Sequence, residues 1–170
     1  MKELRKAIDT AYAFYKDAPI TKRSGVSKMK HLHDGDEILK LLGVNLDVRC
    51  AWYLHPLFQT SLSTTRESLT KFSSEVVWLG MCYRKADNSF LCTSETDEFV
   101  TVPHVEIPTE VKYMLLADKL QNYKDFKRYH KGEHLRTEEL DSYFNKWLDY
   151  LDVELQWKTK HPSLLNYHGS

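Results

Sequence analysis

Apolar residues recur three and four positions apart through most of this chain, a spacing that gathers them on one face of an α-helix. The longest such stripe runs through Leu140, Phe144, Trp147, Leu148, Leu151 and Leu155. It predicts a helix over residues 137–157, and similar spacing predicts helices over about residues 4–15, 28–42, 47–57 and 63–83 and one that opens at Thr109. The sequence therefore predicts a mostly α-helical bundle of about six helices.

Helix-breaking and turn-forming residues set the limits of these segments. Pro19 and Pro56 should end the first and third helices, and Gly43 is placed to cap the second. Between residues 88 and 105, two β-prone stretches flank a polar one, which favours a small β-hairpin inserted into the bundle. The tail beyond Pro162 should be loosely ordered.

The composition is that of one globular domain. A chain of 170 residues with 42% hydrophobic residues can close a single core, so we expect residues 1–170 to form one domain. Its 24 basic and 24 acidic residues cancel, which makes nucleic acid an unfavoured partner. Apolar runs fall short of the ~18 residues of a membrane span, and the three cysteines lack C-x-x-C spacing. We therefore expect a cytoplasmic protein without a membrane anchor.

Three residues of metal-binding type lie on three different predicted helices: His31, His55 and Asp118. Helices that converge in a bundle can bring such side chains together, and imidazole and carboxylate groups suit a divalent transition-metal ion. A single histidine is more often a structural residue than a ligand, so spacing alone does not establish a site. The order of motifs around these residues carries more information.

Two segments are the most specific: Lys22–His31, which carries Arg-x-Gly before its histidine, and Leu116–Asn122, which reads Leu-Ala-Asp-Lys-Leu-Gln-Asn. Together with Ala51–His55, they resemble the HD domain of RelA/SpoT-type enzymes, including the small alarmone hydrolases, over residues 4–127. Those enzymes remove the 3′-pyrophosphate of (p)ppGpp with the help of Mn²⁺. The resemblance implies an HD-like helical fold and a nucleotide ligand.

The resemblance also implies roles for individual residues. His31, His55 and Asp118 occupy the positions of metal ligands, and Lys22, Arg23 and Asn122 those of nucleotide-contacting residues. Cations suit phosphates, and an amide can hydrogen-bond a ribose or a base. The implied cofactor is Mn²⁺, and the implied ligand is a guanine or other nucleotide.

The chain departs from the family at three functional positions. Pro56 follows the second histidine where the family has a metal-binding aspartate, and Gln59 and Thr60 stand where it has a glutamate and an aspartate that activate water. None of these three residues is a base near neutral pH, and loss of the acid–base pair alone costs about 10²–10⁴ in rate. Asp34, which lies three residues after the first histidine, is a candidate compensating ligand.

Three functions fit this pattern. The leading interpretation is a catalytically degenerate HD domain that binds a guanine or other nucleotide, or a regulatory protein, without standard Mn²⁺-dependent hydrolysis. An alternative is an active metal-dependent (p)ppGpp or nucleotide phosphohydrolase with a rearranged metal site. A third is a pure protein-interaction module that uses residues 90–102 or the last helix.

Overall fold

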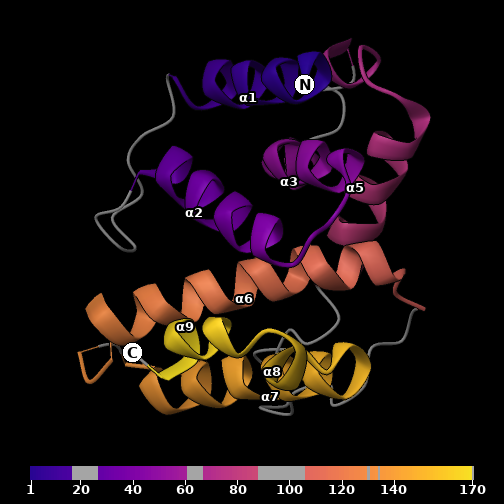
Figure 1. Cartoon of the computed structure of the whole chain (residues 1–170). Coiled ribbons are helices and arrows are strands. Elements are labelled where there is room, and N and C mark those ends of the chain that lie inside the picture. Colours follow the sequence, from indigo (N-terminus) through magenta and orange to yellow (C-terminus); the bar gives the residue numbers. More distant parts are fainter. Residues whose placement is uncertain (17–26, 61–66, 88–105, 130, 134, 170) are drawn as a thin grey trace.

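The computed structural model describes residues 1–16, 27–60, 67–87, 106–129, 131–133 and 135–169 (Figure 1). These residues form helices and turns and contain no strand, which confirms the prediction of a mostly helical protein. The β-hairpin predicted near 88–105 lies outside the described residues. The elements are α1 (Lys2–Tyr15), α2 (Lys28–Leu41), α3 (Leu46–Phe58), α5 (Ser74–Asp87), α6 (Thr109–Tyr129), α7 (Thr137–Leu155), α8 (Trp157–Lys160), the 3₁₀ turn η2 (Pro162–Leu164) and α9 (Leu165–Gly169).

Side-chain caps explain where several of these helices begin. The Ser27 hydroxyl accepts a hydrogen bond from the backbone of Lys30 at the start of α2, and the Asn45 side chain accepts one from Val48 at the start of α3. Each bond satisfies a backbone N–H that has no partner within its own helix. Between these two helices, Gly43 adopts a φ of +69°, a left-handed conformation that glycine tolerates best.

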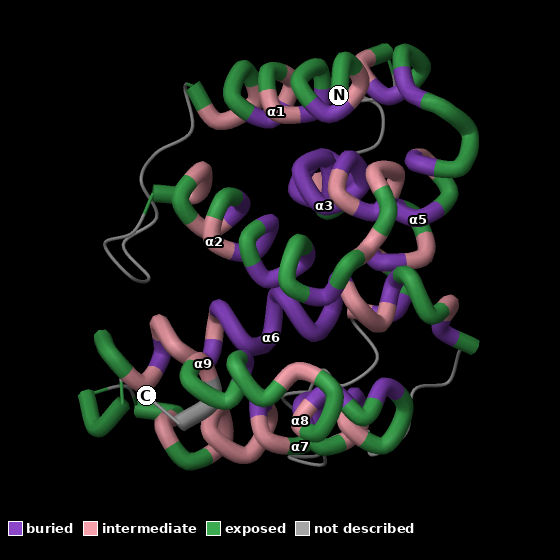
Figure 2. Tube along the Cα trace, viewed as in Figure 1, coloured by how far each residue is buried: buried purple, intermediate pink, exposed green. Residues whose placement is uncertain are grey.

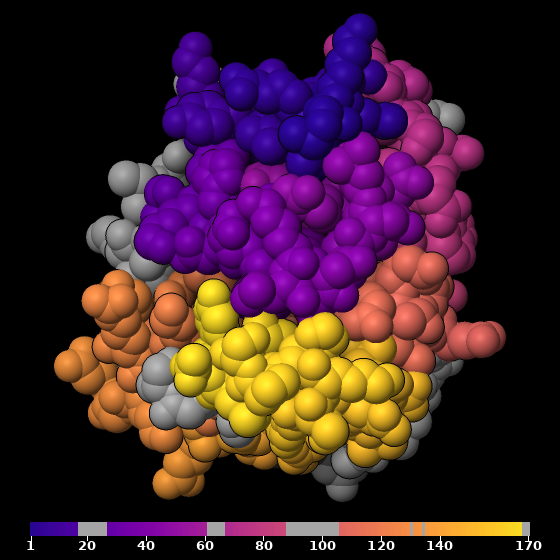
Figure 3. Space-filling model, in the orientation of Figure 1, coloured from indigo at the N-terminus to yellow at the C-terminus, as the bar shows by residue number. Residues whose placement is uncertain are grey.

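The helices are stacked in layers around α6 (Figure 1). The helix α1 covers α3, the helices α2, α3 and α5 contact one side of α6, and α7 and α9 contact its other side. Burial follows this order, because α3 and the middle of α6 are the most continuously buried segments (Figure 2). On the face shown in Figure 3, the C-terminal segment fills the lower part of the molecule, below α2. Side chains of α2, α3 and α6 therefore meet at the centre of the protein.

Two glycines allow large rings to pack closely in this core. A Cβ atom at Gly35 of α2 would lie 2.1 Å from the Trp52 indole of α3, and one at Gly80 of α5 would lie 2.2 Å from the Phe58 ring. Both rings are fully buried. Interiors pack at the density of organic crystals, so neither ring has free space into which it could withdraw.

Three expectations about helix limits are wrong. The helix predicted over residues 63–83 is interrupted, because residues 67–69 form a separate helical turn and the Ser73 hydroxyl caps α5 by accepting from the Val76 backbone. Pro56 lies inside α3, which continues to Phe58. Residues beyond Pro162 are helical rather than loosely ordered, and Leu164 is completely buried. Burial of apolar side chains such as Leu164 stabilises this tail in a defined conformation.

Candidate metal centre

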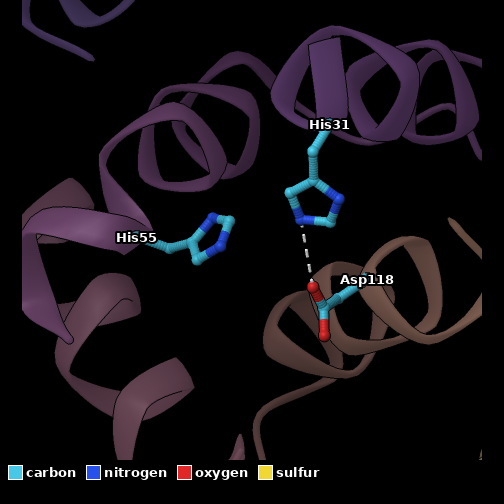
Figure 4. Close-up of side chains that lie close together, drawn as sticks. All are labelled: His31, His55 and Asp118. Carbon is cyan, nitrogen blue, oxygen red and sulfur yellow. Dashed lines mark ion pairs between the residues drawn. The ribbon is translucent and has the colours of Figure 1, made fainter. Parts of the chain in front are cut away.

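The structure brings together the three side chains that the sequence singled out. His31 comes from α2, His55 from α3 and Asp118 from α6, and one potential ligand atom of each lies within 4.8 Å of the others (Figure 4). The Nε2 atom of His31 is 3.3 Å from Oδ1 of Asp118. The exposed fractions are 22% for the His31 side chain and 8% for that of Asp118. These residues form a largely buried polar cluster, which we call the His–His–Asp cluster.

Pro56 has a direct structural effect on His55. A proline has no N–H, so the carbonyl of Trp52, four residues earlier in α3, loses its usual helical partner. The Nδ1 atom of the His55 ring lies 2.6 Å from this carbonyl oxygen and donates to it. With the proton on Nδ1, the Nε2 atom carries a free lone pair. Pro56 thus leaves a backbone carbonyl that orients the neighbouring histidine.

A second hydrogen bond fixes the tautomer of His31. Its Nδ1 atom pairs with the side-chain oxygen of Gln121, and the amide nitrogen of Gln121 donates to Asp125 over 3.0 Å. Because Gln121 uses its nitrogen for Asp125, its oxygen is left to accept from His31. The Nε2 atom of His31 is therefore the one directed at Asp118. Metal-binding histidines commonly donate their other N–H to a partner in this way.

Asp118 is held in its charged form by several neighbours. Its Oδ1 accepts from Asn122 at 3.0 Å, and its Oδ2 accepts from the ammonium group of Lys119 at 3.1 Å. Burial opposes ionisation, but the charges of Lys119 and His31 outweigh it and hold the pKa of Asp118 well below its usual value. A buried and ionised carboxylate is a suitable ligand for a cation.

The two histidines differ in their ease of protonation. Burial lowers the pKa of His55 to about 4, so this ring is neutral at physiological pH and keeps its lone pair. Burial also lowers the pKa of His31, but the hydrogen bond and charge of Asp118 have a larger combined effect and raise it above the usual value. An ion that replaces this proton would take over the interaction between His31 and Asp118.

Trp52 packs against both histidine rings. Its ring centroid lies 4.5 Å from that of His55 and 5.5 Å from that of His31. The indole is completely buried and donates from Nε1 to the carbonyl oxygen of Leu32 at 2.7 Å. Trp52 therefore packs as a fixed surface against both imidazoles and limits their rotation, while the two imidazoles lie edge to face with centroids 6.1 Å apart.

Two charged residues that the sequence analysis missed lie beside this cluster. The buried Lys119 ammonium donates to Asp87 at 2.6 Å as well as to Asp118. Asp87, the last residue of α5, also accepts a hydrogen bond from the Gln59 amide at 3.2 Å. Once an ion displaces the His31 proton, two carboxylates against one ammonium leave one net negative charge, which favours that ion. The position of Lys119 within the Leu116–Asn122 motif was the only signal of its role in the sequence.

The remaining candidate residues lie in different places. Asn122 contacts the cluster through Asp118, whereas Asp34 is ion-paired with Lys30 and is not part of the cluster. The Thr60 hydroxyl donates to the carbonyl of Leu57, and Gln59 reaches Asp87 as described above. Lys22 and Arg23 lie outside the described residues.

A polar cavity of about 170 Å³ lies next to the cluster, between α2, α6 and the C-terminal helix. Its lining includes Lys124, Arg128, Tyr129 and Tyr167, together with Gln121. Gln121 bonds to the Nδ1 side of His31, and Asp118 faces the Nε2 side. A ligand in this cavity would therefore contact the residue that orients His31 rather than the three potential ligand atoms.

One pair of donor atoms already has the spacing of ligands on one transition-metal ion, and the donor atom of His55 lies within 4.8 Å of both. Ligands bound at about 2.1 Å and at tetrahedral or octahedral angles lie roughly 3.0–3.4 Å apart. The 3.3 Å separation of His31 Nε2 and Asp118 Oδ1 falls in that range. Two neutral imidazoles and one carboxylate suit Mn²⁺, Fe²⁺ or Zn²⁺. The residues that are present thus fit the metal that the family resemblance implies.

Comparison with known proteins gives no relatives. No family model matches the chain, and no curated protein or solved structure matches it either. The motif residues and the geometry of the cluster are therefore the features that indicate a function.

Proposed function

We propose that this chain is a divergent RelA/SpoT-like HD domain that binds a divalent transition-metal ion and a nucleotide without standard Mn²⁺-dependent hydrolysis. The observation that carries the metal-binding part is the convergence of His31, His55 and Asp118 from three helices. Hydrogen bonds on both Nδ1 atoms leave the Nε2 atom of His55 with a free lone pair and direct the Nε2 atom of His31 at Asp118, where an ion can replace its proton. Buried clusters in helical bundles commonly hold ions in this way.

The nucleotide-binding part rests on the family resemblance. Lys22 and Arg23 are the proposed phosphate contacts, and Asn122, which lies one helical turn from Asp118, is the proposed sugar or base contact. A guanine nucleotide is the ligand class that this resemblance favours.

The proposed loss of hydrolysis follows from the three substituted positions. Pro56 offers no side-chain ligand, and the Gln59 amide is engaged as a donor to Asp87. The Thr60 hydroxyl donates to a backbone carbonyl within its own turn. A bound ion would supply Lewis acidity and lower the pKa of a coordinated water, but neither Gln59 nor Thr60 can accept a proton from that water.

One observation favours an active enzyme as a second candidate. Asp87 places a carboxylate against Gln59, at the position where the family has its acid–base pair. A carboxylate delivered from α5 could take the role of the missing base, with Lys119 holding it in place. In this case, an Asp87→Asn variant would lose turnover while keeping its bound metal.

Metal content is the first test of the proposal. We expect purified protein supplemented with Mn²⁺, Fe²⁺ or Zn²⁺ to retain about one equivalent of ion by elemental analysis, and an Asp118→Asn variant to lose more than about 100-fold in affinity. Asp34→Asn is the matched control, because Asp34 is an acidic residue of α2 outside the cluster. Wild-type protein that binds no metal would refute the metal site.

The ligand is tested with the metal-loaded protein and a panel of ppGpp, pppGpp, NADPH and nucleoside triphosphates. Thermal stabilisation without product formation would support the proposed binding domain. Turnover that is lost in Asp118→Asn and in Asp87→Asn would instead establish the rebuilt enzyme. Absence of both stabilisation and turnover would contradict both proposals and favour an interaction module.

A further inference from the structure

The hydroxyl of Tyr83 is a buried polar group at the His–His–Asp cluster. Tyr83 lies on α5 and is completely buried. Its ring centroid is 4.9 Å from that of His55, with the two planes tilted by 54°. Its hydroxyl makes no hydrogen bond of normal geometry with any described residue, although Asp118 is close enough for a weak one. A buried hydroxyl without a good partner is costly, and an ordered water, an ion or a ligand is a common reason for one.

The surroundings of this hydroxyl define what it can bind. A phenol has an ordinary pKa of about 10, so the hydroxyl keeps its proton near neutral pH and can donate it. The nearby acceptor is Asp118, whose oxygens are already engaged, Oδ1 by Asn122 and Oδ2 by Lys119. The hydroxyl is therefore a donor beside the potential ligand atoms whose nearby acceptor is shared with stronger donors.

We propose that Tyr83 donates a hydrogen bond to an oxygen atom bound to the ion at His31, His55 and Asp118, and that this atom is a phosphate oxygen when a phosphate ligand is present. This inference rests on the proposed metal site and adds to it a residue that selects the ligand. A phosphate oxygen has lone pairs for both the ion and the phenol. In the absence of phosphate, a water would take the same place.

The chemistry of the Tyr83 side chain favours a role in binding the oxygen ligand rather than the metal ion. A phenol is a poor ligand for an ion near neutral pH, because its ordinary pKa is about 10 and only its ionised form binds strongly. Its position next to His55 nevertheless puts it on the border of the cluster. Replacing Tyr83 should therefore change the affinity for the oxygen ligand and leave the affinity for the ion unchanged.

The test uses protein loaded with Co²⁺, whose visible absorption reports changes in its ligands, and inorganic phosphate as the probe. For Tyr83→Phe we expect an unchanged Co²⁺ affinity and a phosphate affinity about tenfold weaker than that of the wild type. The thermal midpoint of the metal-free variant should be unchanged or higher, because the substitution removes a buried hydroxyl that has no partner of normal geometry.

Tyr53→Phe is the matched control. Tyr53 is also a buried tyrosine, but its hydroxyl is hydrogen-bonded, to Asp36 at 3.2 Å and to His33 at 2.9 Å. Its loss should lower the thermal midpoint of the metal-free protein and leave the phosphate affinity of the Co²⁺ form unchanged. The two variants are thus expected to show opposite effects on stability and on ligand binding.

The results separate this inference from the metal site itself. Wild-type protein that binds no Co²⁺ refutes the metal site, and the role of Tyr83 falls with it. Co²⁺ binding with equal phosphate affinity in wild type and Tyr83→Phe, or with no phosphate binding in either, overturns the role of Tyr83 alone. A lower thermal midpoint together with weaker Co²⁺ binding in Tyr83→Phe would show that the hydroxyl is a structural partner of Asp118, and would also overturn the inference.

Discussion

Gly35→Ala should damage the metal site without touching any of its ligands. A methyl group at Gly35 would lie 2.1 Å from Cζ2 and 2.6 Å from Cε2 of Trp52, far inside van der Waals contact. The indole cannot rotate away freely, because it is completely buried and its Nε1 is bonded to Leu32. It must shift, and because its ring packs against both His31 and His55, these side chains should be displaced with it.

The size of the effect follows from two opposing contributions. Replacing a glycine within a helix by alanine stabilises the helix by roughly 0.5–1 kcal/mol. Forcing extra volume into a packed core costs typically about 1–3 kcal/mol. We expect a net loss of about 1–2 kcal/mol, which lowers the thermal midpoint of a domain of this size by roughly 2–8 °C. Displacement of the two histidines should also weaken Mn²⁺ binding by about tenfold or more.

Gly80→Ala is the control for this prediction. A methyl group at Gly80 would lie 2.2 Å from the buried Phe58 ring, so it overpacks the core to a similar degree. Among the described residues, the rings in contact with His31 and His55 do not include Phe58, so Mn²⁺ affinity should stay at the wild-type value. Thermal unfolding and isothermal titration with Mn²⁺ measure the two effects. Equal Mn²⁺ affinities in the two variants would refute the idea that Trp52 positions the histidines.

Three further changes have calculable effects on stability. Lys119→Met leaves the carboxylates of Asp87 and Asp118 without their buried ammonium, so the free energy of unfolding in urea should fall by about 3–5 kcal/mol, and a loss below about 1 kcal/mol would contradict the ion-pair network. The folded pKa of His55, about 4, lies below its unfolded value of roughly 6.5, so its contribution is present above about pH 6.5 and is lost as the pH falls towards 4. This loss should reach about 3 kcal/mol in urea titrations and disappear in His55→Gln. Trp157→Ala removes a fully buried indole and should cost about 3–5 kcal/mol by the same assay, whereas a loosely attached C-terminal segment would show almost none.

The helices that the sequence predicted well are those whose apolar stripes decide their burial. The expected stripe of Phe144, Trp147, Leu148 and Leu151 is buried on α7, and α1 and α2 also begin and end near the expected residues. The Pro56 prediction failed because a proline removes only one helical hydrogen bond, and the His55 ring supplies a substitute at the carbonyl that was freed. This replacement hydrogen bond depends on the orientation of the His55 side chain, which the spacing of apolar residues in the sequence does not predict.

The candidate site could also be predicted only in part from the sequence pattern. His31, His55 and Asp118 could be predicted as a group because they sit in recognisable motifs, and the structure brings them together. Asp87 could not, because the predicted helix ended at residue 83 and the true α5 begins later and continues to Asp87. A lysine is expected to be exposed to solvent, so the sequence offers no reason to place Lys119 in the interior. The structure shows that Lys119 is buried and paired with two carboxylates.

The spacing of the three candidate ligands along the chain has a consequence for folding. His31 and His55 are 24 positions apart, and Asp118 follows 63 positions after His55. In an unfolded chain, gathering the three residues around one ion would require closing the chain segments between them into loops, which costs conformational entropy. In the folded chain the three residues are already close together, so this cost does not arise on binding. An ion that binds here therefore favours the folded state almost exclusively, by about 2.7 kcal/mol when its free concentration is 100 times its dissociation constant. Through this coupling, the free ion concentration would set how long the domain survives thermal stress.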